Sequence, residues 1–137
     1  MEIQNKNKEY TSKGNIVYSC QYHVIFCPKY RRRVLVDDIK VDLEEIILNN
    51  QTEYDYKIIE MEIMPDHVHL LIDINPKTGV FSTICKIKGV SSRELRLKYP
   101  CLKKRIPTLW TRSEFISSVG SVSLSVVKQY IEDQKER

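Results

Sequence analysis

Two histidines lie two residues apart in the apolar segment Met64-Pro65-Asp66-His67-Val68-His69-Leu70-Leu71-Ile72. On a β-strand, side chains two residues apart share a face, so His67 and His69 would lie side by side while Val68 packs in the core. Two neutral imidazoles this close together suit a divalent metal ion. Two surface histidines without a ligand would show the same spacing, so both interpretations stay open.

A tyrosine and a glutamine form a second candidate group near the C-terminus. Tyr130 and Gln134 are four residues apart and share one face of a predicted helix. A tyrosine oxygen can serve as a nucleophile. However, a tyrosine with valine and isoleucine neighbours on a helix is commonly a core residue with a hydrogen-bonded hydroxyl. The spacing does not decide between these interpretations.

Basic residues gather in the second half of the chain. Residues 1–70 carry a net charge of −3 and residues 71–137 a net charge of +7. Nine basic residues and one acid lie within 86–112, and a second basic cluster reads Lys29-Tyr30-Arg31-Arg32-Arg33. Such clusters are typical of surfaces that bind polyanions such as nucleic acids, although a solvated helix face has a similar composition.

Three predicted strands would carry the histidines. Residues 16–27 alternate in polarity and predict a strand whose outward side chains include His23. Residues 56–64 and 67–74 predict two more strands, joined by the Met64-Pro65-Asp66 turn into an antiparallel hairpin. This hairpin is expected to turn Asp73 outward and to bury Ile59, Met61, Ile63, Val68, Leu70 and Ile72.

Predicted helices separate and follow these strands. Asp37 or Asp38 is expected to cap a helix that ends near Asn49 and Asn50, and a basic helix is expected over 80–98, stopped before Pro100. Residues 107–119 predict an extended segment. Gly120 is expected to end this extended segment, and Ser121 or Ser123 is expected to cap a final helix to the C-terminus.

The resulting order is β-α-β-β-α-β followed by an extra helix, which is typical of an α+β, ferredoxin-like (RRM-like) antiparallel sheet with helices on one face. We expect residues 1–15 to form a polar arm and residues 16–137 a single domain. Strand alternation places five polar side chains together on the open sheet face: His23, Glu60, Glu62, His67 and His69.

Composition argues against several other classes. No segment approaches the roughly 18 apolar residues of a membrane span, and the polar N-terminus has no apolar signal-peptide core. A cytoplasmic protein is therefore expected. The four cysteines include no Cys-x-x-Cys pair, which disfavours a zinc knuckle or a disulfide scaffold and predicts buried free thiols.

Taken together, the motifs resemble those of the single-tyrosine HUH transposases of small insertion sequences. The resemblance spans residues 16–134 in the family's order. It rests on Pro65-Asp66-His67-Val68-His69, Ser118-Val119-Gly120 and Tyr130-Ile131-x-x-Gln134, supported by Tyr22-His23-Val24-Ile25-Phe26-Cys27-Pro28-Lys29-Tyr30-Arg31, Lys88-Gly89-Val90-Ser91-Ser92 and Leu109-Trp110.

The resemblance implies a metal-dependent enzyme that cleaves and rejoins single-stranded DNA carrying hairpin ends, through a 5′-phosphotyrosine intermediate. It implies that Tyr130 is the nucleophile and that His67, His69 and Gln134 bind Mg²⁺ or Mn²⁺. It also implies a homodimer in which the tyrosine helix, hinged at Gly120, completes the partner's site, with no membrane and no nucleotide cofactor. The residues expected to contact DNA are His23, Lys29, Arg31, Arg32, Arg33, Lys86, Lys88 and Arg93.

Three alternatives remain for comparison. A catalytically inactive module that binds hairpin DNA or RNA would share the fold, although the open sheet face has histidine and glutamate where an RRM has stacking aromatics. Replication or conjugation nucleases with the same metal motif generally have longer chains. A hydrolytic metallonuclease would not need Tyr130 and would release the cut DNA.

Overall fold

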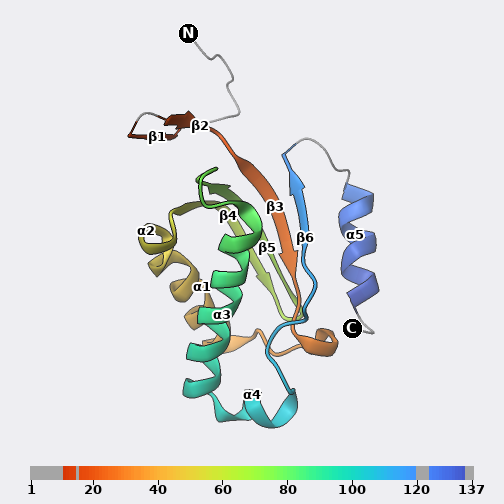
Figure 1. Cartoon of the computed structure of the whole chain (residues 1–137). Helices are drawn as coiled ribbons and strands as arrows, with labels where there is room; N and C mark the ends of the chain where they lie inside the picture. The colour runs from red at the N-terminus through yellow and green to blue at the C-terminus, as the bar shows by residue number, and fades with distance from the viewer. Residues whose placement is uncertain (1–10, 15, 120–123, 135–137) are drawn as a thin grey trace.

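A four-stranded antiparallel sheet forms the centre of the molecule. In this computed structural model, which describes residues 11–14, 16–119 and 124–134, the strand order is β4-β5-β3-β6. The strands are β3 (Gln21–Phe26), β4 (Tyr56–Met64), β5 (His67–Ile74) and β6 (Phe115–Ser118). Helices α1 (Asp37–Asn49) and α3 (Val80–Lys98) cover one side of the sheet, and α5 (Leu124–Asp133) lies on the other side, along β6 (Figure 1). This is the predicted ferredoxin-like arrangement with an extra helix.

The hydrophobic core lies between the sheet and the two covering helices. Alternate residues of β3 and β5 are fully buried there, as are apolar residues at helical spacing on α1 and α3. These are Val24, Phe26, Val68, Leu70, Ile72, Leu43, Ile47, Ile84 and Ile87. The Trp110 ring packs edge-on against Phe26 with centroids 4.7 Å apart, and its Nε1 donates to Ser91 Oγ at 3.0 Å. The hydrogen bond between Trp110 and Ser91 therefore holds the segment before β6 against α3.

The predicted hairpin and the predicted basic helix are confirmed at the same boundaries. Ile59, however, is exposed, and its predicted burial is wrong. Strand pairing shifts between Ile58 and Glu60, so a β-bulge inserts one extra residue and turns Ile59 away from the core. Because the bulge resets the alternation, Glu60 and Glu62 still face the histidine side.

The predicted strand over 16–27 is divided into β2 (Ile16–Tyr18) and β3, and residues 11–13 of the predicted polar arm form β1 (Thr11–Lys13), which pairs with β2. Asp73 explains the division. Its carboxylate accepts from the Cys20 backbone N–H at 2.8 Å and from Thr11 Oγ1 at 2.9 Å. Asp73 is therefore buried beneath this hairpin instead of facing outward as predicted.

The helix ends differ from expectation. The residue that precedes α1 is Val36, with no side-chain cap, so the predicted capping by Asp37 or Asp38 is wrong. Three short helices were not predicted: η1 (Lys29–Arg31), α2 (Gln51–Tyr54) and α4 (Pro100–Arg105). Of the extended segment over 107–119, only β6 is a strand. The predicted break and caps at Gly120, Ser121 and Ser123 lie outside the described residues.

All four cysteines are free thiols, but they are not all buried as predicted. Cys27 is buried, and burial raises its pKa to about 12. Cys20 is half-buried, and Cys85 and Cys101 are exposed on the helices. Among the described residues, no helix combines the length and the apolar character needed to cross a membrane.

Candidate functional site

The two histidines of β5 lie on the sheet face opposite α1 and α3. His69 pairs with Ile25 on one side and with Glu62 on the other, so these side chains share its face. The same register places His23 and Glu60 beside Leu71 on this face. A hollow is lined there by His23, Glu60, Met61, Glu62, His69 and Leu71. The structure thus gathers the five polar residues that strand alternation predicted to share a face.

His67 is oriented by the residue that precedes it. Asp66 lies in the β4–β5 turn, and its Oδ1 is 2.9 Å from His67 Nδ1. Burial alone would raise the pKa of Asp66, but hydrogen bonds from Arg31 and His67 outweigh burial and hold it below its usual value. An ionised carboxylate accepts the Nδ1–H of a neutral imidazole, which leaves the Nε2 lone pair available to a ligand.

His69 has a different neighbour. Its Nε2 lies 3.3 Å from His23 Nδ1, and the two rings are tilted by 45° with centroids 5.4 Å apart. Burial, followed by the nearby His23 ring, lowers the pKa of His69 below its usual value, although Glu62 acts in the opposite direction. A neutral ring at neutral pH is the form that binds metals. Binding a metal through Nε2 would require His69 to leave its hydrogen bond with His23.

The residues present fit a divalent cation held mainly by imidazoles. Within residues 11–14, 16–119 and 124–134, no cluster of three or more His, Cys, Asp or Glu side chains is arranged to hold a metal ion. An amide oxygen is another kind of donor that could complete such a site. The His67–Asp66 hydrogen bond is the kind of support that metal-binding histidines usually have.

The helix that carries Tyr130 docks on the histidine face of the sheet. The Tyr130 ring packs against Phe115 of β6 with centroids 5.1 Å apart. Phe115 pairs with Ile25, which in turn pairs with His69. Phe115 therefore lies in the same row of the sheet as His69, about 10 Å away across two strand spacings, and Tyr130 packs against this end of the row. Ile25, between them, is fully buried, so this half of the predicted open face is covered.

Gln134 is buried just beyond the end of α5. Its Oε1 accepts from Ser113 Oγ at 3.0 Å. Because Ser113 precedes β6 by two residues, it lies toward the end of the sheet where β5 begins with His67. A carbonyl oxygen has two lone pairs, so the bond to Ser113 leaves one acceptor position on Gln134. Sequence reasoning missed Ser113, since no local pattern marks its partner 21 residues away.

Lys88 is directed into the protein. Its ammonium donates to the Thr111 carbonyl at 2.7 Å, to the Ser113 carbonyl at 3.4 Å and to Glu114 Oε2 at 3.2 Å. The side chains of Lys88 and Glu114 are only 12% and 7% exposed. Lys88 therefore holds the segment that contacts Gln134, and its ammonium is directed to protein oxygens, whereas its expected partner is a DNA phosphate.

Arg31 is also engaged within the protein. Its Nε donates to Asp66 Oδ2 at 2.7 Å, and its Nη1 donates to the Ile131 carbonyl on α5 at 3.0 Å. Four of the other residues expected to contact DNA are exposed: Arg32, Arg33, Lys86 and Arg93. Lys29 is half-buried, and its ammonium lies over the Tyr30 ring. The half-buried His23 lies in the histidine hollow.

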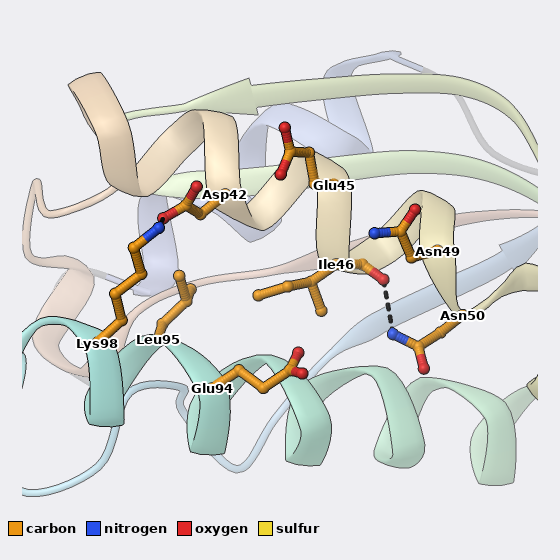
Figure 2. Close-up of a pocket in the computed structure, with 8 residues that line it drawn as sticks. All are labelled: Asp42, Glu45, Ile46, Asn49, Asn50, Glu94, Leu95 and Lys98. Carbon is orange, nitrogen blue, oxygen red and sulfur yellow. Dashed lines mark hydrogen bonds and ion pairs between the residues drawn. The ribbon is translucent and has the colours of Figure 1, made fainter.

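A second hollow lies between α1 and α3, on the other side of the sheet (Figure 2). Its lining includes Asp42, Glu45 and Glu94. Asp42 is paired with Lys98 at 2.8 Å. Carboxylates repel phosphate, so this hollow does not suit a nucleic-acid backbone.

Comparison with known proteins identifies the family. The family model described as "Transposase IS200 like" matches residues 16–134. The chain belongs to the IS200-like transposase family.

Members of this family include relatives similar over most of their length. The ISDra2 transposase TnpA of Deinococcus radiodurans is 35% identical over 123 residues, which cover 88% of each chain. The transposase for insertion sequence element IS200 of Salmonella typhimurium is 31% identical over 121 residues, 87% of this chain and 79% of the relative.

Solved structures agree with the IS200-like assignment. A crystal structure at 1.90 Å of a protein assigned as a transposase, from Deinococcus radiodurans R1, matches with a TM-score of 0.80 and 34% identity, over 93% of this chain and 100% of the other. A REP-associated tyrosine transposase bound to a REP hairpin matches with a TM-score of 0.57 and 10% identity, over 96% of this chain and 69% of the other. The second match shows a shared fold.

Proposed function

We propose that this IS200-like transposase cuts and rejoins single-stranded DNA at the ends of an insertion sequence through a 5′-phosphotyrosine intermediate, and that it recognises hairpins near those ends. The observation that supports this most is the docking of the Tyr130 helix on the sheet face that carries His67 and His69. A nucleophile and two imidazoles that can hold a metal ion, gathered on one face, are groups that can carry out phosphodiester transfer.

In the proposed reaction, the Tyr130 oxygen loses its proton and attacks the phosphorus of a phosphodiester. The bond from phosphorus to the upstream 3′ oxygen breaks, which leaves a free 3′-hydroxyl and a 5′-phosphotyrosine. The 3′-hydroxyl of another strand then attacks the phosphotyrosine, restores a phosphodiester and returns a proton to the tyrosine oxygen. One phosphate ester replaces another at each step, so no ATP is consumed.

We propose that His67, His69 and Gln134 would hold the metal, either Mg²⁺ or Mn²⁺. Bound there, the cation would polarise and orient the scissile phosphate. The His67–Asp66 bond supports this assignment because it orients the His67 ring, and the lowered pKa of His69 supports it because a neutral imidazole is the form that binds metals. The buried amide of Gln134 adds an oxygen ligand of the kind that Mg²⁺ and Mn²⁺ prefer.

We also propose a homodimer in which α5 is exchanged between subunits. Exchange of an identical element preserves its contacts, so the helix would form the same bonds on the partner as it forms within one chain. Those bonds join Ile131 to Arg31 and Gln134 to Ser113.

The exposed basic side chains of α3 are proposed to contact DNA phosphates. Lys86 and Arg93 are seven residues apart and lie on one helix face. Substitution Lys86→Ala should weaken binding of any hairpin sequence and reduce the slope of log affinity against log salt by about 1. Lys40→Ala, which removes an exposed lysine from the acidic helix α1, is the matched control. Equal slopes for the two variants, measured by fluorescence anisotropy, would exclude Lys86 from the DNA surface.

The central test uses hairpin-bearing single-stranded DNA, Mn²⁺ and a denaturing gel. DNA labelled at its 3′ end should migrate with the protein, whereas DNA labelled at its 5′ end should be released as a shorter strand. This polarity follows from attachment of tyrosine to the 5′ phosphate. EDTA should prevent both products.

Two results would contradict the proposal. Retention of the 5′ label would indicate attachment to a 3′ phosphate. Tight hairpin binding with no adduct under any metal condition would indicate instead a catalytically inactive module that binds hairpin DNA or RNA.

A further inference from the structure

Arg31 connects the metal strand with the tyrosine helix. Its Nε donates to Asp66 Oδ2 at 2.7 Å, and the other carboxylate oxygen of Asp66 lies 2.9 Å from His67 Nδ1. The Nη1 group of Arg31 donates to the Ile131 carbonyl at 3.0 Å and lies 3.7 Å from Glu132 Oε1 on α5. A continuous path of two side chains therefore runs from the His67 ring to the residue after Tyr130.

The backbone around Arg31 is held in an unusual conformation. Tyr30 and Arg31 both have positive φ angles, 58° and 50°, although neither is glycine. Bonds from Lys29 N–H to the Leu109 carbonyl at 2.9 Å and from Arg31 N–H to the Pro28 carbonyl at 2.8 Å hold the turn. Consecutive left-handed residues persist only where the surroundings fix them, which commonly occurs at functional sites.

Stability of the turn alone does not explain the Arg31 contacts. The Leu35 N–H already donates to the Pro65 carbonyl at 3.0 Å, which ties the segment after η1 to the β4–β5 turn. Arg31 adds a contact to a helix 100 residues away in sequence. Its side chain is 14% exposed and that of Asp66 is 9% exposed, so water competes weakly with this pair.

We propose that Arg31 and Asp66 form a coupling relay that links metal occupancy at His67 to docking of the tyrosine helix. The proposal rests on the function proposed above and assigns two positioning residues to it. A cation bound at His67 Nε2 makes the Nδ1–H a stronger donor to Asp66. Asp66 in turn fixes the guanidinium that receives the Ile131 carbonyl, so α5 docks more firmly when the metal is bound.

Arg31→Lys separates the two functions of the guanidinium. One lysine ammonium can pair with Asp66 or reach the Ile131 carbonyl, but it lacks the fork that serves both. Hydrogen exchange of α5 amides in the metal-free full chain should become about tenfold faster in this variant. Arg32→Lys, the same change at an exposed neighbour, should stay within about twofold of the wild type. Equal exchange in the two variants would overturn the proposal.

The test with metal must first remove the direct link between the metal and α5 that Gln134 would provide as a ligand. In a Gln134→Ala background, saturating Mn²⁺ should still slow α5 exchange by about threefold or more, because binding free energies are reciprocal between coupled sites. In Gln134→Ala/Arg31→Lys, Mn²⁺ should leave α5 exchange unchanged. Equal protection in both backgrounds would show that the metal acts on α5 without Arg31.

Asp66→Asn is the second variant and keeps the side-chain shape. It should weaken Mn²⁺ binding by about tenfold, measured by electron paramagnetic resonance of free Mn²⁺, and should abolish Mn²⁺-dependent protection of α5. Unchanged exchange of α1 and α3 amides reports that each variant is folded. None of these readouts uses DNA. A wild-type chain that forms no adduct therefore contradicts the proposed function alone, and absence of Mn²⁺-dependent α5 protection in the Gln134→Ala background contradicts the relay alone.

Discussion

Replacing Tyr130 by phenylalanine is expected to abolish the covalent DNA adduct, lowering its yield by about a thousandfold or more. The substitution removes the attacking oxygen and keeps the ring that packs on Phe115 at 5.1 Å. The helix should stay docked, so hairpin affinity should remain within about twofold of the wild type. Denaturing gels measure the adduct, and fluorescence anisotropy measures the affinity.

Tyr54→Phe is the matched control, since it removes the hydroxyl of a half-buried tyrosine on α2, away from the histidine face. It should form the adduct at the wild-type rate. Persistence of the adduct in Tyr130→Phe would show that another residue is the nucleophile. An equal loss in both variants would show that the assay reports general damage and not the chemistry.

Mixing Tyr130→Phe with His67→Ala subunits determines where the nucleophile acts. With exchanged helices, the heterodimer contains one site that has both an intact tyrosine and intact histidines, and the adduct reappears. With helices retained on their own subunits, every site lacks one group and no adduct forms. The second result would contradict the proposed exchange and leave the roles of both residues intact.

Lys88→Met is expected to lower the free energy of unfolding by about 3 kcal/mol, because it leaves the buried Glu114 carboxylate without its cation and removes a donor from the Thr111 and Ser113 carbonyls. Urea denaturation measures the change. Lys86→Met, two residues earlier on the exposed side of the same helix, should change stability by no more than about 0.5 kcal/mol.

A double variant tests the cause of this loss. Lys88→Met/Glu114→Gln replaces the buried carboxylate by a neutral amide, so it should be more stable than Lys88→Met alone. Equal costs for the two lysine substitutions would show that Lys88 is solvated in solution. A Lys88 that contacted DNA instead would alter the salt dependence of binding and leave stability unchanged.

The hairpin and its histidine face could be predicted because local sequence determines them. A two-residue turn and the alternation from Glu60 to the end of β5 fix the register there, whereas the bulge turns Ile59 out and places Ile58 opposite Ile72. Asp73 was predicted wrongly because its partners, Thr11 and Cys20, lie 62 and 53 residues away. Alternation gives the face of a strand residue, and tertiary contacts decide whether that face is covered.

The tyrosine half of the site could not be built from sequence patterns. Arg31 and Lys88 have the composition of a polyanion-binding surface, but both cations are directed to protein oxygens. Nothing in the spacing of residues indicates that Arg31 contacts Ile131 or that Ser113 contacts Gln134. The roles of Tyr130 and Gln134 rest on family resemblance, to which the structure adds the contacts that hold their helix.

The strand order also implies a sequence of assembly during synthesis. The β4–β5 hairpin closes through two residues, whereas β6 pairs with β3 across a separation as long as that of Val24 and Ile116. Loop closure of that length is slow, and the C-terminal segment leaves the ribosome last. A nascent chain would therefore form its histidine strand before its tyrosine helix is made. The two halves of the proposed site would meet only when β6 completes the sheet and Phe115 can pack against Tyr130.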